Sequence, residues 1–534
     1  MKQTGAPSDH STLEGLDPAG TGRVFWNLGM AALCERAVAR GEARLSTTGA
    51  LVVSTAQSGR EISLALVDDA ASESGAAPAT PAPQAGKEAP APNSVAPLTR
   101  THFEALKADM LAYVGSRTLF GQDLSVETGP GRGLALRILS EQAWHALSMR
   151  HLIRPCAAAE GGEMATRLTV LCAPGFRPTP ETHGVAADGA LALDPANGLA
   201  LIAGTARSEV IRAALAHLLV GPLMEQKVLP LEAAATTGPT GNVALFLGGA
   251  GTGKSALAGA LANGLTDDGV SARIADGALG WGEEGLIALE AGAYARPADL
   301  AHSAEAARAA RGFAAVLENV ALDPASRTPD LTEAASTAAS RIILPADPSD
   351  GAPHPAMGPP AHLFLLVQDA SGALPAIARL NPAQALGHCL STTDGVPALA
   401  ECHEPRLRRL LAQHAPSCWL VNTGWVGGAA GTGQRVPPDA SRRLVDAAQA
   451  GELASGEWRT DPHFGFEVPA ALEGVDPGLL DPAQAFASHS DHGAAARRLA
   501  RWFAAQLARF EAASGEAQGA QPESAQPGMV LAAE

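Results

Sequence analysis

The sequence predicts a mixed α/β protein with two domains. Short apolar runs of strand length, ALVV, NVALFL, HLFLLV and CWLVN, occupy residues 50–53, 242–247, 362–367 and 418–422. They alternate with Ala-, Leu- and Arg-rich stretches of helical composition, such as SEVIRAALAHLL and SRRLVDAAQAG. This alternation is typical of α/β or α+β proteins and leaves open whether the sheet is parallel. A chain of 534 residues with 46% hydrophobic composition can bury one or two large cores, which favours two domains.

Three segments lack the large apolar side chains that a packed core needs. Residues 70–98 consist mostly of Ala, Pro, Ser and Gly, so burial cannot offset the entropy lost on ordering them. We therefore expect a mobile insertion there. Residues 1–18 and 515–534 have a similar composition, and both are predicted to be disordered tails.

The charge and the cysteines exclude several classes of protein. A formal net charge of −17 argues against nucleic acid or an anionic membrane as the main partner, since both favour clustered Lys and Arg. The six cysteines include no C-x-x-C pair, which fits free thiols in a reducing compartment. No signal peptide or bilayer-spanning apolar run is visible. These features predict a cytoplasmic protein that binds neither nucleic acid nor membrane.

A glycine-rich stretch, GGAGTGKS, fits the phosphate-loop pattern G-x-x-x-x-G-K-[ST]. It follows NVALFL and precedes SALAGALANGL, which is the strand-loop-helix context that the pattern requires. The glycines let backbone N–H groups turn toward an oxyanion, Lys254 would neutralise β and γ oxygens, and Ser255 would offer a hydroxyl to Mg²⁺. The alternative is a Gly-rich turn that matches by chance. The predicted nucleotide-binding residues of this loop are Gly248, Gly249, Ala250, Gly251, Thr252, Gly253, Lys254 and Ser255.

Asp276 is the candidate carboxylate partner for that metal ion. It ends the run SARIAD, which is typical of a buried strand, and a strand-terminal Asp near a phosphate loop is a common Mg²⁺ partner. A turn-forming Asp before Gly277 explains the same residue equally well. Ser255 and Asp276 are therefore the predicted metal-binding residues, with the turn as the alternative.

Several longer strings, together with the phosphate loop, point to a known family. They are LVNTGWVGGAAGTGQR, EWRTDPHFGFEVP, VLENVALDP, EAGAYAR and QDASGALPAIARLNPAQAL. The chain resembles the ATP-dependent phosphoenolpyruvate carboxykinases over about residues 23–475. The resemblance implies that family's two-domain mixed α/β fold, with an N-terminal domain over 19–225 and a P-loop nucleotide-binding domain over 226–514. It also implies ATP, Mg²⁺ and Mn²⁺, and the conversion of oxaloacetate into phosphoenolpyruvate and CO₂.

The nucleotide side of the family's site is largely kept in this sequence. Arg435 matches a basic residue that the family places beside the nucleotide, and Arg296 stands where the family has a Lys close to the phosphates. Asp276 matches the first acid of the family's G-D-D-E-H-G-W motif. Each of these residues could instead be a surface charge, but their occurrence in register with the phosphate loop favours nucleotide binding.

The oxaloacetate and Mn²⁺ side of the family's site is not kept. The Lys, His and Asp that bind Mn²⁺ in the family correspond to Ala213, Glu232 and Gly277. Arg212 stands where a second family Lys assists the phosphate, and Ser336 replaces an Arg that stabilises the transferring phosphoryl group. Losing one such group costs roughly 10² to 10³ in rate. This pattern predicts little or no carboxykinase activity.

Three functions stay open on the sequence alone. The favoured one is a phosphotransferase that passes the γ-phosphoryl group of ATP·Mg²⁺ to a new acceptor such as a protein, with Lys254, Arg212 and Glu232 as its catalytic residues. The second is a non-catalytic nucleotide-binding regulator with a protein partner. The third is an active carboxykinase whose metal site the alignment misplaces. Glu232 also has a simpler explanation, an exposed side chain left after Mn²⁺ was no longer needed.

Overall fold

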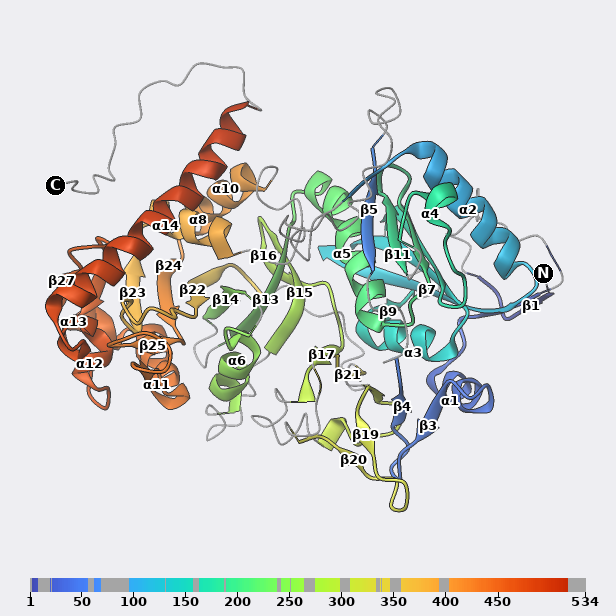
Figure 1. Ribbon diagram of the computed structural model, residues 1–534, viewed down its shortest axis with the longest axis horizontal. Helices are drawn as coiled ribbons and strands as arrows, with labels where there is room; N and C mark the ends of the chain where they lie inside the picture. Colours follow the sequence, from blue (N-terminus) through green and yellow to red (C-terminus); the bar gives the residue numbers. More distant parts are fainter. Residues whose placement is uncertain are drawn as a thin grey trace. The chain divides into compact units, whose positions relative to one another are not determined.

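The structure is a computed structural model of the chain (Figure 1). It describes residues 2–7, 20, 22–55, 62–68, 96–129, 131–156, 163–186, 189–237, 242–249, 251–263, 274–297, 308–332, 337, 339–345, 357–392 and 403–516. Most of the predicted insertion, residues 70–95, lies outside this set, as do residues 517–534. Within the predicted N-terminal tail, Lys2–Thr4 forms strand β1 and pairs with Arg23–Trp26.

Two compact units make up the chain. The first comprises Met1–Leu231, Gly277–Gly280 and Ile287–Ala356, and the second comprises Glu232–Asp276, Trp281–Leu286 and Met357–Glu534. After the phosphate loop, the chain therefore contributes two further segments to the first unit. The predicted domain boundary between residues 225 and 226 stays a prediction.

A large mixed sheet dominates the first unit. Its strands are β1 (Lys2–Thr4), β2 (Arg23–Trp26), β5 (Ser63–Val67), β6 (Ala96–Leu98), β7 (Thr118–Gly129), β8 (Arg132–Ser140), β9 (Arg154–Pro155), β10 (Glu163–Ala173), β11 (Ala190–Asp194) and β12 (Leu199–Ala203). Their order is β1-β2-β7-β8-β10-β12-β11-β5-β6, with β9 on β7. The strands β7 and β8 form an antiparallel hairpin, whereas β8, β10 and β12 run parallel.

Smaller sheets and several helices complete the described part of the first unit. A five-stranded sheet has the order β17-β21-β18-β4-β3 and is built from Ala293–Ala295, Arg341–Leu344, Val316–Glu318, Leu51–Val53 and Ala43–Leu45. Strands β19 (Ala321–Leu322) and β20 (Pro329–Asp330) pair with each other. The helices are α1 (Met30–Ala39), α2 (Arg100–Val114), α3 (Ala143–Leu152), α4 (Pro180–His183) and α5 (Ser208–Glu225).

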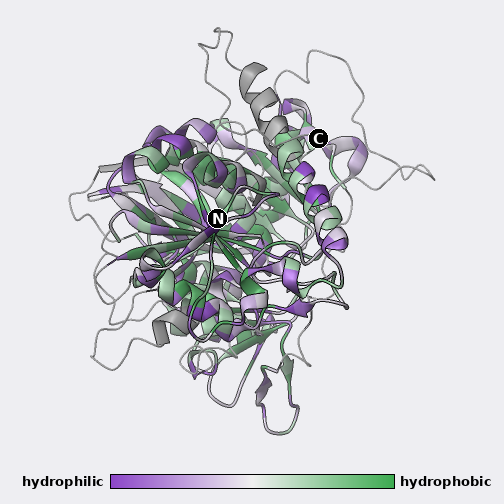
Figure 2. Ribbon diagram, turned by 90° about the vertical axis from the view of Figure 1, so that its left-hand side faces the viewer, coloured by the Kyte–Doolittle hydropathy of each residue, from purple (hydrophilic) through white to green (hydrophobic). Residues whose placement is uncertain are grey.

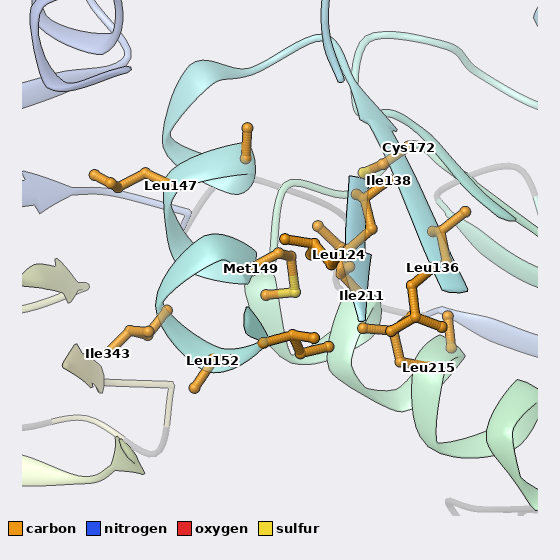
Figure 3. Close-up of a cluster of buried hydrophobic side chains, with 14 of the residues drawn as sticks. Leu124, Leu136, Ile138, Leu147, Met149, Leu152, Cys172, Ile211, Leu215 and Ile343 are labelled. Carbon is orange, nitrogen blue, oxygen red and sulfur yellow. The ribbon is translucent and has the colours of Figure 1, made fainter. Parts of the chain in front are cut away.

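The core of the first unit lies where helices α3 and α5 cover the large sheet. Helix α5 buries Ile211, Ala214, Leu215 and Leu218, which is the spacing of one helical face. Figure 3 shows Ile211 and Leu215 gathered with Met149 of α3, Leu124 of β7, and Leu136 and Ile138 of β8. Burial of these apolar side chains holds the N-terminal turn of α5, which carries Arg207 to Arg212, against the sheet.

Helix α3 also buries two histidines, and both are held as neutral imidazoles. The Nε2 atom of His145 donates to the Ala206 carbonyl over 2.8 Å, and Nε2 of His151 donates to the Ala314 carbonyl over 2.8 Å. Burial lowers the pKa of each from an ordinary value near 6.5 to about 4. In the unfolded chain both imidazoles take up protons near pH 6.5, so protonation favours unfolding below that pH.

We expect the free energy of unfolding to fall as the pH drops from 6.5 to 4, by roughly 3 kcal/mol for each of these two histidines. Above pH 6.5 their contribution is constant, because both are neutral in either state. Denaturant titrations across pH 4 to 8 measure this dependence. The double variant His145→Gln/His151→Gln is the control and has a shallower slope below pH 6.5. Equal slopes for the wild type and the variant would contradict the assignment.

The second large sheet carries the phosphate loop. Its strands are β13 (Leu229–Thr237), β14 (Val243–Gly248), β15 (Ile274–Gly282), β16 (Gly285–Ala288), β22 (Pro360–Val367), β23 (Ile377–Leu380), β24 (Ser417–Asn422), β27 (Trp458–Thr460) and β28 (Glu467–Pro469). Their order is β16-β15-β13-β14-β22-β24-β23-β28-β27. The buried strands β14, β22 and β24 are parallel neighbours, so their carboxyl ends reach one edge of the sheet.

Helices and one hairpin complete the second unit. The helices are α6 (Lys254–Asn263), α8 (Pro382–Thr392), α10 (Glu404–His414), α11 (Pro438–Gln449), α12 (Pro477–Leu480), α13 (Pro482–Ala485) and α14 (His489–Glu516). The hairpin pairs β25 (Trp425–Val426) with β26 (Gln434–Arg435). The strands are mostly hydrophobic, while the helices mix hydrophilic and hydrophobic residues (Figure 2).

None of the helices in the described residues combines the length and the apolar composition that a membrane span requires. The cysteines that the structure describes, Cys34, Cys156, Cys172, Cys389 and Cys418, are all free thiols, and Cys402 lies outside the described residues.

Candidate functional site

The phosphate loop joins β14 to α6 and has the backbone that its glycines allow. Gly251 and Gly253 have φ values of +83° and +91°, which lie in the left-handed region that favours glycine. A Cβ atom on either residue would meet nothing within 4 Å, so the space above these two peptides is open. The Thr252 hydroxyl donates to the Gly249 carbonyl over 2.9 Å. Ala250 lies outside the described residues.

Lys254 lies at the start of α6 and folds over this loop. Its Nζ atom donates to the carbonyls of Gly248 and Gly249 over 2.6 and 3.1 Å. The next residue, half-buried Ser255, is in the first turn of the same helix. Backbone N–H groups and the positive end of the helix dipole therefore face the region where the lysine lies, and together they suit a phosphate group.

Two side chains from just past neighbouring strands hold the loop, and neither is among the residues predicted from the sequence. The Gln368 side chain, just past β22, donates to the Gly251 carbonyl over 2.7 Å. The Thr423 hydroxyl, just past β24, donates to the Thr252 carbonyl over 2.9 Å. A signal for them exists in the sequence, because QD and NTG directly follow the buried runs HLFLLV and CWLVN.

Asp369 follows Gln368 at the same sheet edge, but its carboxylate is fully engaged by the protein. It accepts hydrogen bonds of 2.6 to 2.8 Å from the Ser371 amide and hydroxyl and from the Ala373 and Leu374 amides. The residue is only 6% exposed. Asp369 therefore shapes the turn after β22, and its four hydrogen bonds leave it poorly suited as a metal ligand.

The other residues predicted for the nucleotide and its metal belong to four different strands or the residues just past them. Arg435 is exposed on β26, with its guanidinium carbon 5.6 Å from the centre of the Trp425 ring. Arg296 is exposed just past β17 of the first unit. Asp276 and Glu232 are exposed on the neighbouring strands β15 and β13. Among the described residues, no group of three or more His, Cys, Asp or Glu side chains could hold a metal ion. The roles assigned to these four residues stay predictions.

In the first unit, Arg212 of α5 forms a bidentate ion pair with Glu290. Its Nε and Nη2 atoms donate to the two carboxylate oxygens over 2.7 and 3.0 Å. The Ala278 amide donates to the same carboxylate over 3.0 Å, and the guanidinium carbon lies 5.1 Å from the centre of the Tyr294 ring. Both side chains are largely buried, at 21% and 8% exposure. The sequence predicts a role for Arg212 but gives no sign of its partner Glu290.

A buried carboxylate anchors the start of the same helix. Glu318 on β18 is 2% exposed and accepts hydrogen bonds from the hydroxyls of Ser208 and Thr55. Burial raises the pKa of Glu318, and these hydrogen bonds act in the opposite direction. The Ser208 hydroxyl also lies 3.3 Å from the phenol oxygen of Tyr294, whose pKa burial and the Glu318 charge raise to about 12. Tyr294 therefore stays a neutral phenol beneath the Arg212 guanidinium.

The start of α5 carries a second cluster of charges. Glu209 accepts hydrogen bonds from Arg207 and from Arg341, the latter over 3.0 Å. With Arg212, these residues place three guanidinium groups around the first turns of one helix. Ser336, the residue at the family's phosphoryl-stabilising Arg, lies outside the described residues.

Together these features place the chain among mixed α/β proteins that carry a P-loop at the carboxyl edge of a sheet. The sequence profile of a protein family, described as phosphoenolpyruvate carboxykinase, matches residues 22–398 and 396–478 of this chain. The chain belongs to this family. The resemblance seen in the sequence and the carboxykinase-like mixed α/β fold are thereby confirmed.

Similar proteins come from several bacteria, and each is named phosphoenolpyruvate carboxykinase (ATP). The protein of Allorhizobium ampelinum is 35% identical over 542 residues, covering 96% of this chain and 97% of its own. That of Agrobacterium fabrum is 35% identical over 563 residues, covering 98% and 99%. That of Mesorhizobium japonicum is 36% identical over 540 residues, covering 96% of each.

These comparisons correct the functional prediction. The expectation that the chain has lost carboxykinase activity and become a phosphotransferase for another acceptor is wrong, because the similarity to carboxykinases covers almost the whole of both chains. The regulator with a protein partner gains no support either. The error came from treating Ala213, Glu232 and Gly277 as decisive. A missing ligand shows that one group has changed, but other donors can supply the same charge.

Proposed function

We propose that this chain is an ATP-dependent phosphoenolpyruvate carboxykinase, which converts oxaloacetate and ATP into phosphoenolpyruvate, CO₂ and ADP. The observation that carries the proposal is the phosphate loop with Lys254, found in a chain similar along nearly its whole length to proteins of that name. The open space above Gly251 and Gly253 suits the phosphates of a nucleotide. Arg435 and Arg296 are the further nucleotide-binding candidates.

The chemistry of the candidate residues suggests a role for each of them in the proposed reaction. Lys254 and the loop amides bind the β and γ phosphates and orient the γ-phosphoryl group for transfer. Mg²⁺ bound with ATP would neutralise phosphate charge, and Ser255 with Asp276 would be its protein partners. Loss of CO₂ from oxaloacetate leaves an enolate, whose oxygen then attacks the γ phosphorus and releases ADP. Arg212 is the candidate donor for the enolate oxygen or the transferring group.

The test is direct detection of phosphoenolpyruvate. Purified protein receives oxaloacetate, ATP and Mg²⁺, and the product is followed by ³¹P NMR, because oxaloacetate also decarboxylates without an enzyme and CO₂ release alone is ambiguous. We expect equal amounts of phosphoenolpyruvate and ADP. A reaction without oxaloacetate is the control. ADP without phosphoenolpyruvate, or neither product with any divalent cation, would refute the proposal.

A further inference from the structure

We infer that the Arg212–Glu290 ion pair takes the place of a second, protein-bound metal ion in this carboxykinase, with Glu290 as the positioning residue for Arg212. The inference rests on the proposed function and concerns how the first unit stabilises negative charge. It assigns Glu290 a role and predicts which metal ions the protein does and does not bind.

The donor set does not fit the Mn²⁺ ion that the family's pattern implies. Of the three corresponding positions, Ala213 and Gly277 have no side-chain donor, and only Glu232 offers oxygen atoms. A cation such as Mn²⁺ needs several protein ligands arranged around one point. The described residues contain no cluster of three ligating side chains anywhere. No step of the proposed reaction is therefore assigned to a protein-bound Mn²⁺.

The position of Glu290 explains why residue 277 is a glycine. A Cβ atom built on Gly277 would lie 2.3 Å from a Glu290 carboxylate oxygen and 3.3 Å from Nη2 of Arg212. The φ value of +119° also disfavours any other residue. An Asp at position 277 would require the Glu290 carboxylate to move from its present place, so it would disturb the ion pair as it stands. Glycine at position 277 leaves the space that the Arg212–Glu290 pair occupies.

The pair fixes a permanent positive group in a defined orientation. The guanidinium is a cationic group with planar donors, and its Nε and Nη2 atoms donate to Glu290. The Tyr294 ring packs against the guanidinium, and the Ala278 amide donates a hydrogen bond to the carboxylate. A rigid, partly buried guanidinium is a strong donor for an enolate or phosphoryl oxygen.

The first test measures Mn²⁺ binding without any activity assay. Mn²⁺ is titrated into the nucleotide-free protein, and the signal of the free ion is followed by electron paramagnetic resonance. We expect no stoichiometric binding. One tightly bound equivalent in the wild type that is lost in Glu290→Gln would overturn the inference. Because this measurement needs no turnover, it stands even if phosphoenolpyruvate is never formed and the proposed function fails.

The second test separates positioning from folding. We expect Arg212→Ala to lower kcat by roughly 10²-fold, and added guanidinium at millimolar concentration to restore part of it. The same compound has no effect on the double variant Arg212→Ala/Glu290→Gln, since the carboxylate that would bind it is gone. The control Glu452→Gln breaks an exposed Arg443–Glu452 pair of 2.6 to 2.9 Å and leaves kcat unchanged. Equal rescue of both Arg212 variants would overturn the role of Glu290.

The third test measures two rates: the kcat of a Gly277 variant, and the wild-type rate with Mg²⁺ or Mn²⁺. Gly277→Ala pushes the Glu290 carboxylate away, so we expect it to lower kcat while Gly41→Ala, at φ +71° with nothing within 4 Å, does not. With Mg²⁺ as the sole divalent cation, the wild type reaches its full rate. A rate that rises by an order of magnitude on adding Mn²⁺, or unchanged kcat in Gly277→Ala, would contradict the inference.

Discussion

Replacing Lys254 with alanine is expected to lower the rate of phosphoenolpyruvate formation by roughly 10²- to 10³-fold. The lysine is the ammonium group that reaches the phosphate loop, with Nζ 2.6 Å from the Gly248 carbonyl and 3.1 Å from that of Gly249. The variant loses a charge that would neutralise the β and γ phosphates. It also leaves these two carbonyls without their donor, so ATP binding weakens as well and KM for ATP rises.

Steady-state kinetics with ³¹P NMR detection measure both effects. Lys107→Ala is the matched control, because Lys107 pairs with Glu104 on the surface of α2 and has no role in the loop. We expect the control to retain wild-type kcat and KM. If Lys254→Ala keeps the wild-type kcat, the phosphate loop has no role in the proposed reaction.

Replacing Asp123 with alanine is expected to lower the free energy of unfolding by about 3 to 5 kcal/mol. Asp123 on β7 accepts a 2.8 Å hydrogen bond from Arg137 on β8, and the two side chains are 4% and 1% exposed. The Arg137 guanidinium also lies 4.6 Å from the centre of the Trp26 ring. Without the carboxylate, a buried guanidinium loses its opposite charge, and its desolvation is no longer offset.

Denaturant titration measures this loss of unfolding free energy. Two further variants test whether it comes from the buried ion pair. Arg443→Ala removes a comparable but exposed ion pair and should cost much less stability than Asp123→Ala. The double variant Asp123→Leu/Arg137→Met removes both charges and should recover much of the stability. If Asp123→Ala costs no more than Arg443→Ala, the buried pair contributes little to the fold.

The contiguous parts of the molecule were predictable from the sequence. NVALFL, HLFLLV and CWLVN coincide, within two residues at either end, with β14, β22 and β24, because each is a buried strand with a local apolar signature. The phosphate loop is likewise one continuous motif. Its glycines, its lysine and the helix that follows are all specified within a few residues.

The rest depends on pairings between distant residues. Glu290 lies 78 residues from Arg212, and Gln368 lies 117 residues from the loop carbonyl that it holds. No local pattern reveals such contacts, since they follow from the strand order and from register. The functional error had the same origin. The missing ligand at Gly277 was taken to mean lost activity, and the local sequence does not show that the Glu290 carboxylate lies beside this residue.

Gln368 and Thr423 have a further consequence for affinity. They donate hydrogen bonds to the carbonyls of Gly251 and Thr252 from just past two parallel strands, so the protein itself holds the phosphate loop in place. Ordering a residue's backbone costs about 1 to 2 kcal/mol of entropy. Here the loop is already ordered when the chain folds. In the proposed reaction, the binding energy of the triphosphate is therefore not reduced by ordering the loop, and it can contribute to affinity and to the orientation of the γ-phosphoryl group.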